Sequence, residues 1–164
     1  MAALTPGRKA PAVSLADTSG QEMSLADPLK NGPVVLAFFK VTCPICQFTF
    51  PFIERIHKAF GTSKFTFWGI SQDDARDTRE FVKEYGIQFP ILIEERGYAV
   101  SNQYGITNVP TIFLISPGGE IQISSVGFEK DALEKIASEA ARATDKPASA
   151  LFKPSEAIPA YKPG

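Results

Sequence analysis

Two kinds of apolar pattern alternate along the chain. Continuous apolar runs rich in β-branched and aromatic residues are typical of strands buried on both faces. Apolar residues that repeat every three to four positions predict helices with one buried face. The runs predict strands at 34–40, 65–71, 89–95 and 111–116. The repeats predict helices at 44–60, 73–86, 97–105 and 129–143.

Turn signals divide the remaining residues into hairpins. The sequence DTSG separates short strands at 12–16 and 21–25, and PGG joins the last apolar run to a strand at 120–126. Strands that alternate with helices predict an α/β fold, with a mixed and mostly parallel sheet that ends in one antiparallel hairpin. We expect residues 1–145 to form one domain.

Composition agrees with one globular domain and excludes several classes of partner. The chain has 164 residues, of which 44% are hydrophobic and 21% are charged, and its net charge is −1. This balance provides no basic surface for nucleic acid, and no apolar run approaches the roughly 20 residues that span a bilayer. Because the first residues lack the apolar run of a signal peptide, we expect a cytoplasmic protein, or a periplasmic or other extracytoplasmic one if a signal peptide has been removed.

The last segment, residues 146–164, differs in composition from the rest of the chain. It carries four prolines and is expected to form an extended C-terminal extension. Its apolar side chains are expected to pack on the body of the domain; they are Leu151, Phe152, Ile158 and Tyr161.

Both cysteines lie in the stretch KVTCPICQF, separated by two residues. Pro44 suits the first position of a helix, which places Cys43 at the N-cap and Cys46 one turn further on. Residues three apart on a helix are neighbours, so a small adjustment allows a disulfide. Unpaired amides and the positive end of the helix dipole favour a thiolate at Cys43. We therefore predict that Cys43 attacks a disulfide and that Cys46 resolves the mixed disulfide.

Simpler roles for the two cysteines remain as alternatives. They could be ordinary core residues, or half of a zinc site. Zinc needs four ligands, and the chain offers only His57 besides this pair, about three helical turns from Cys46 and expected at the surface. We therefore expect no metal and no other cofactor.

The apolar strand, the CPIC sequence and Pro51 five residues later resemble the thioredoxin superfamily. The segment NVPTIF is similar to the family's X-Pro-Thr segment, in which the proline is cis and opposes the active-site helix. The resemblance implies a cis Val109–Pro110 bond, with the main chain of Val109 pairing with a substrate strand. It also places Thr42, Pro44 and Ile45, which flank the cysteines, among the substrate-binding residues.

The hairpin at 12–25 and the strand–helix unit at 65–86 go beyond a minimal thioredoxin and resemble the TlpA/ResA-like and AhpC/TSA (redoxin) branches. The resemblance implies a thioredoxin-like fold: a central mixed β-sheet flanked by helices, with an N-terminal β-hairpin and an inserted βα unit. Peroxiredoxins carry P-x-x-x-T-x-x-C and an arginine near the TIFLI strand. Here Lys40 replaces the threonine and that arginine is absent, although Thr42 adjoins Cys43.

An acidic residue is also expected beside the cysteines. Ala37 stands where thioredoxin has a buried acid. In ResA-like proteins an acid lies at the end of the next strand, and the matching residue here is Asp73. Either Asp73 or Asp74 is expected to cap the helix that follows, and if Asp74 does so, Asp73 is left to assist deprotonation of Cys46.

These features predict a thiol–disulfide oxidoreductase that works by dithiol/disulfide exchange at CPIC. Its expected partners are a disulfide-containing protein substrate and an external thiol electron donor, and we expect a monomer. Two alternatives remain, a peroxiredoxin-like thiol peroxidase and a redox-gated protein-binding module.

Overall fold

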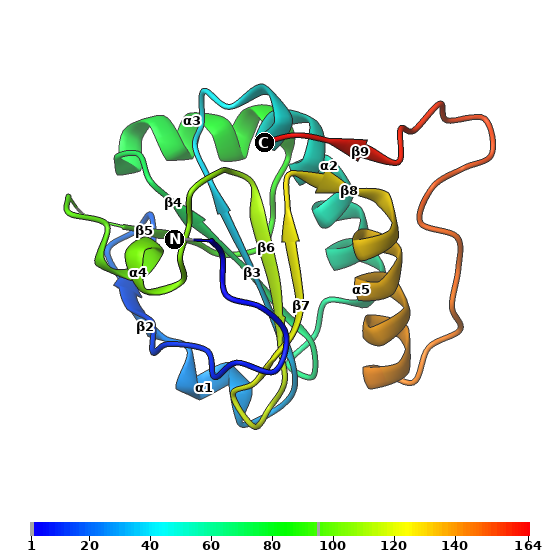
Figure 1. Cartoon of the computed structure of the whole chain (residues 1–164), viewed down its shortest axis with the longest axis horizontal. Helices are drawn as coiled ribbons and strands as arrows, with labels where there is room; N and C mark the ends of the chain where they lie inside the picture. The colour runs from blue at the N-terminus through cyan, green and yellow to red at the C-terminus, as the bar shows by residue number, and fades with distance from the viewer. Residues whose placement is uncertain (1, 95) are drawn as a thin grey trace.

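The computed structural model describes residues 2–94 and 96–164 (Figure 1). Its centre is a five-stranded sheet with the strand order β5-β4-β3-β6-β7. Two of the four pairings are parallel and two are antiparallel, because β6 runs against β3. The sheet is therefore mixed, and the expectation of a mostly parallel sheet was wrong. The strands are β3 (Val34–Phe39), β4 (Thr66–Ser71), β5 (Ile91–Ile93), β6 (Thr111–Ile115) and β7 (Ile121–Val126).

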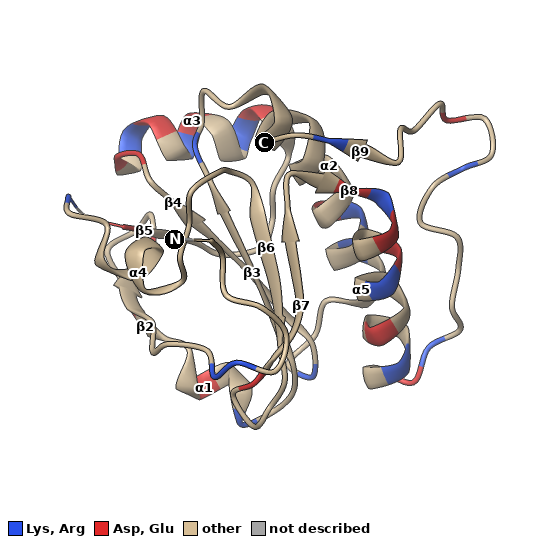
Figure 2. Ribbon diagram, in the orientation of Figure 1, with Lys and Arg blue, Asp and Glu red and all other residues tan. Residues whose placement is uncertain are grey.

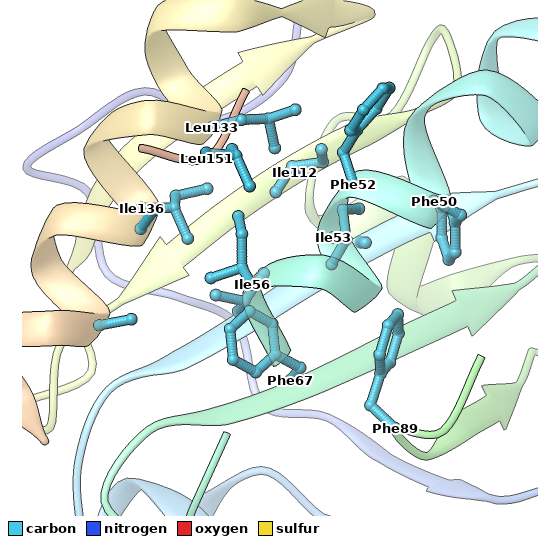
Figure 3. Packing of buried hydrophobic residues seen from close by; sticks show 14 of the residues in the cluster. Phe50, Phe52, Ile53, Ile56, Phe67, Phe89, Ile112, Leu133, Ile136 and Leu151 are labelled. Atoms are coloured by element: carbon cyan, nitrogen blue, oxygen red, sulfur yellow. The ribbon is translucent and has the colours of Figure 1, made fainter. Parts of the chain in front are cut away.

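Three helices cover one face of this sheet. They are α2 (Pro44–Phe60), α3 (Ala75–Tyr85) and α5 (Lys130–Ala143). Alternate residues of β3 point toward them and join a cluster with Ile53, Phe81 and Ile136, one from each helix. Figure 3 shows the α2 and α5 members of this cluster closing over the sheet. Burying each such side chain stabilises the fold by roughly 1.5–3 kcal/mol, so this face anchors α2.

The opposite face is covered by the N-terminal segment and by α4 (Ala99–Gln103). The predicted hairpin is present as β1 (Ser14–Ala16) and β2 (Glu22–Ser24). It is followed by α1 (Ala26–Leu29), one helical turn that the sequence pattern did not predict. The buried Tyr104 hydroxyl donates a hydrogen bond of 2.6 Å to the carbonyl of Pro11, which fastens the N-terminal segment to the sheet.

The C-terminal extension packs along the domain. It leaves α5, runs outside α2 and α5, and returns across the top of the sheet (Figure 1). Leu151 and Phe152 are buried and Ile158 packs against the same cluster, as predicted, whereas Tyr161 is 54% exposed. Two short strands that the pattern did not predict hold its end, β8 (Phe128–Glu129) and β9 (Tyr161–Lys162).

Charged residues are frequent on α3 and α5, and the five strands of the central sheet carry none (Figure 2). This distribution follows the amphipathic patterns of these helices. Within residues 2–94 and 96–164, no helix has both the length and the apolar character needed to cross a bilayer.

Candidate active site

Cys43 is held at the junction of β3 and α2. Its backbone is extended and its side chain caps the helix, with the Sγ accepting a hydrogen bond of 3.2 Å from the Cys46 amide. Pro44 occupies the first turn, as the sequence predicted. The Cys43 amide donates to the carbonyl of Lys40, and the Gln47 side chain donates to the carbonyl of Val41, which fixes the loop between strand and helix. The Cys43 side chain is therefore held between the end of β3 and the start of α2.

Cys46 is fully buried one turn into α2, whereas Cys43 is partly exposed. Both are free thiols. Burial is the main cause that raises the pKa of the Cys46 thiol strongly above its ordinary value, with smaller contributions from Cys43 and from the charge of Asp73. The pair is therefore asymmetric, with one accessible sulfur and one buried sulfur that holds its proton.

The Val109–Pro110 peptide bond is cis, as the resemblance to the thioredoxin superfamily implied. It precedes β6 and lies against the first turn of α2, where the Cys43 thiol donates a hydrogen bond of 3.4 Å to the Val109 carbonyl. Pro110 is buried and Val109 is partly exposed. The structure thus brings together Cys43, Cys46, Val109 and Pro110 from two separate parts of the chain.

The two neighbouring aspartates have different roles. Asp74 caps α3, accepting a hydrogen bond of 2.8 Å from the Asp77 amide. The carboxylate of Asp73 turns the other way and accepts a hydrogen bond of 2.8 Å from the Val41 amide, in the loop before Cys43. Asp73 is therefore free of the cap and lies close enough to Cys46 for its charge to act on that thiol.

The other predicted residues border the cysteines. Thr42 and Pro44 are exposed and Ile45 is half-buried, so all three flank the partly exposed Cys43. Sequence reasoning missed a polar groove of about 290 Å³ that begins at Lys40 and Val109. Tyr98 also lines this groove and is 39% exposed. An exposed aromatic residue in a short loop gives no periodic signal, so the sequence pattern could not find it.

The prediction for His57 was wrong. Its ring is half-buried, packed edge-on against Phe67 and Phe89, and its Nδ1 lies 3.2 Å from the carboxylate of the buried Glu54. Among the described residues, 2–94 and 96–164, no cluster of three or more His, Cys, Asp or Glu side chains could hold a metal ion.

Solved structures share this fold. The thioredoxin domain of a thiol-disulfide oxidoreductase from Bacteroides vulgatus superposes with a TM-score of 0.74 at 26% identity, covering 83% of this chain and 97% of that one. A thiol:disulfide interchange protein of the thioredoxin family from Chlorobium tepidum gives a TM-score of 0.69 at 28% identity, covering 85% and 99%. The fold is therefore thioredoxin-like, with the N-terminal hairpin and inserted βα unit that the sequence predicted.

The family model described as the AhpC/TSA family matches residues 6–124. The chain belongs to this family, in its ResA/TlpA-like branch. Thiol-disulfide oxidoreductase ResA from Bacillus subtilis is 29% identical over 119 residues, which make up 72% of this chain and 65% of ResA. Thioredoxin-like protein YneN from the same organism is 30% identical over 127 residues, 74% of this chain and 71% of YneN. The match thus leaves about a third of ResA without a counterpart here.

Proposed function

We propose that this protein is a thiol–disulfide oxidoreductase that uses Cys43 and Cys46 as its redox pair. The observation that carries the proposal is the position of the Cys43 sulfur at the N-cap of α2, 3.2 Å from the Cys46 amide and 3.4 Å from the Val109 carbonyl. A helix amide stabilises a thiolate at that place. The carbonyl marks where an extended substrate segment can lie beside the nucleophile.

In the reductant direction, the Cys43 thiolate attacks one sulfur of a substrate disulfide. The substrate S–S bond breaks, a Cys43–substrate bond forms, and the second substrate sulfur leaves as a thiolate that takes up a proton. Cys46 then loses its proton and attacks the Cys43 sulfur. This step forms the Cys43–Cys46 disulfide and releases the other substrate thiol, so two electrons have passed to the substrate.

Asp73 is proposed to receive the proton of Cys46. The buried Cys46 thiol holds its proton tightly, so the second step needs a base. Asp73 is the carboxylate whose charge reaches Cys46, and its backbone contact with Val41 holds it beneath the active-site loop. The proposed transfer runs through one water molecule between Asp73 and Cys46.

The proposed substrate is a disulfide-containing protein, and an external thiol donor restores the dithiol by two further exchanges. The substrate main chain lies along Val109 and Pro110, while Thr42, Pro44 and Ile45 contact the residues on either side of the substrate cysteine. Both cysteines belong to one chain, so a monomer contains the whole redox pair.

The test compares two oxidants on the fully reduced protein. Stopped-flow mixing with a protein disulfide, such as that of insulin, and separately with hydrogen peroxide would follow tryptophan fluorescence and free thiols. We expect rapid disulfide exchange that Cys43→Ser abolishes, and a peroxide reaction no faster than that of an ordinary thiol. A peroxide reaction far above that rate would overturn the proposal in favour of a thiol peroxidase. Binding that depends on redox state, without turnover of either oxidant, would favour a redox-gated binding module.

A further inference from the structure

The segment Tyr161–Gly164 lies against the active site, although it is more than a hundred residues from the cysteines along the chain. It begins with β9, which pairs antiparallel with β8, and the Ala160 carbonyl accepts a hydrogen bond of 3.0 Å from the Lys130 amide. The Lys162 ammonium lies 4.8 Å from the centre of the Phe48 ring, two residues after Cys46. This segment therefore meets α2 close to the redox pair. We call residues 161–164 the strap.

The main chain of the strap packs directly against the main chain of the loop before β6. A Cβ added at Gly164 would lie 2.4 Å from the Val109 carbonyl oxygen, and one added at Gly127 would lie 2.5 Å from the Lys162 carbonyl oxygen. Only glycine permits both approaches. The Asn108 side chain also donates a hydrogen bond of 3.4 Å to the Gly164 carbonyl. The end of the strap is thus seated on the residues that surround the cis proline.

The same carbonyl of Val109 faces both the strap and the nucleophile. Its oxygen accepts the hydrogen bond from Cys43 at 3.4 Å. An extended substrate segment that brings a disulfide to Cys43 must pass beside this carbonyl. The main-chain surface that it needs is the one that Gly164 covers.

The strap is held by strong anchors upstream and by weak contacts at its own residues. Phe152 is buried against Phe52, with ring centroids 5.1 Å apart, and Arg55 on α2 binds Glu156 through two hydrogen bonds of 2.8 and 3.0 Å. By contrast, the β9 pairing is two residues long and Tyr161 is 54% exposed. The strap can therefore leave its seat while the anchors keep it nearby.

We propose that the strap covers the substrate-binding surface formed by Phe48, β8 and the main chain of Val109 as an intramolecular stand-in, and that a protein substrate must displace it. This inference rests on the proposed disulfide exchange and names the kind of segment that the site accepts. This surface binds an extended segment that pairs with the edge of β8. It takes a cationic side chain over Phe48 and a glycine against the Val109 carbonyl.

Because strap and substrate exclude each other, the apparent affinity for the substrate equals the intrinsic affinity multiplied by the fraction of molecules in which the strap has left this surface. Loosening the strap raises that fraction. Gly164→Ala places a methyl group against the Val109 carbonyl oxygen, too close for both to stay in place, so the strap must shift. Gly118→Ala is the matched control, because its new methyl group would meet nothing closer than 3.8 Å in the turn between β6 and β7.

The first test measures reduction of insulin by wild type, Gly164→Ala and Gly118→Ala at substrate concentrations below saturation. We expect Gly164→Ala to react about five to ten times faster and Gly118→Ala to match wild type. A small aromatic disulfide should gain less from Gly164→Ala, because it contacts little of this surface. Equal or slower reduction of insulin by Gly164→Ala would overturn the proposal.

The second test measures binding without turnover. A synthetic peptide with the sequence of residues 157–164, AIPAYKPG, is titrated into the Gly164→Ala protein and followed by calorimetry. We expect the peptide to bind the Gly164→Ala protein more tightly than it binds wild type. The same peptide with alanine in place of the last glycine should bind the Gly164→Ala protein more weakly than AIPAYKPG does. No binding of AIPAYKPG to Gly164→Ala would overturn the strap proposal. Failure of every protein to reduce any disulfide would instead overturn the proposed function, and the calorimetry would still decide the role of the strap.

Discussion

The carbonyl oxygen of Val109 lies 3.4 Å from the sulfur of Cys43, and these two residues are 66 positions apart in the chain. A protonated thiol donates a hydrogen bond to this carbonyl, but a thiolate has no proton to give. The thiolate still accepts the hydrogen bond from the Cys46 amide, whose nitrogen lies 3.2 Å from the sulfur. Deprotonation of Cys43 therefore releases the Val109 carbonyl from this hydrogen bond, so that it can pair with the proposed substrate main chain once the strap has left.

Replacing Cys43 and replacing Cys46 should block different steps of the reaction. Cys43→Ser removes the accessible nucleophile, so reduction of insulin should fall to the background rate. Cys46→Ser leaves the attack intact but removes the resolving thiol, so a mixed disulfide with the substrate should accumulate. Mass spectrometry of the protein after mixing with insulin separates these outcomes. A stable adduct on Cys46 in the Cys43→Ser protein would contradict the assigned order of attack.

The buried thiol of Cys46 should make the reduced protein less stable at high pH. Burial raises the pKa of this thiol in the folded state, so the folded protein holds the proton more tightly than the unfolded chain does. The resulting stabilisation is complete below about pH 9, the ordinary pKa of such a thiol, and is lost as the pH rises above it. Urea unfolding of reduced wild type should show this loss, and Cys46→Ala should show a flatter profile. Parallel profiles for the two proteins would contradict the assignment.

Replacing Asp73 should slow resolution more than attack. Asp73→Asn keeps an oxygen that can accept the Val41 amide, so the loop should stay in place, but the base is lost. Release of the mixed disulfide should slow by roughly 10²- to 10⁴-fold, with recovery at higher pH, while the first attack by Cys43 changes little. Asp74→Asn is the matched control, since asparagine also caps helices well. Equal slowing in both variants would indicate a structural effect only.

The ion pair between Arg55 and Glu156 should make anchoring of the C-terminal extension sensitive to acid. Hydrogen bonding from Arg55 lowers the pKa of Glu156 to about 2. A lowered carboxyl pKa stabilises the folded state above the ordinary value of 4.5, and this stabilisation is lost as the pH falls toward about 2. The free energy of unfolding in urea should therefore fall between neutral and acid pH in both proteins. The fall should be smaller for Glu156→Gln than for wild type. Glu134→Gln, at an exposed glutamate on α5, should behave like wild type.

Phe152 should contribute more to stability than its place in an extended segment suggests. Its ring packs between those of Phe52 and Phe128, with the Lys130 ammonium 5.8 Å away. Phe152→Ala should lower the free energy of unfolding by about 3 kcal/mol, as for other buried phenylalanines. Tyr161→Ala, at an exposed aromatic of the same extension, should cost less than about 1 kcal/mol. Similar costs for the two variants would mean that the extension does not pack as described.

Long elements with one dominant pattern were predictable from the sequence. Apolar runs located β3, β4 and β6, and the proline at the first turn of α2 placed the cysteines correctly. The direction of β6 relative to β3 was not predictable in the same way, because parallel and antiparallel neighbours bury the same apolar residues. His57 was placed at the surface for a related reason: a helix pattern does not show that two phenylalanine rings from other elements extend beyond its apolar face.

Short elements stabilised by distant partners could not be predicted. The strands β8 and β9 are two residues each, and their sequences carry no period. Arg55 and Glu156 are 101 residues apart, so neither suggests the other. The choice between Asp73 and Asp74 as the helix cap remained open for the same reason, since it depends on the Val41 amide across the site. In the candidate site, the sequence predicted the positions of neighbouring residues such as Cys43 and Cys46. It did not predict contacts between residues that are far apart in the chain.

All six residues of β3 are buried, and the strand is paired on both sides. Its amide protons should therefore exchange with solvent only when the whole molecule unfolds, whereas the amides of residues 40–43, which lie outside the sheet, should exchange faster. The rate of amide hydrogen exchange should therefore rise sharply within a few residues after the end of β3. Cys43 follows the strand whose amides should be the most protected, so local motion around its thiol need not loosen the sheet that supports it.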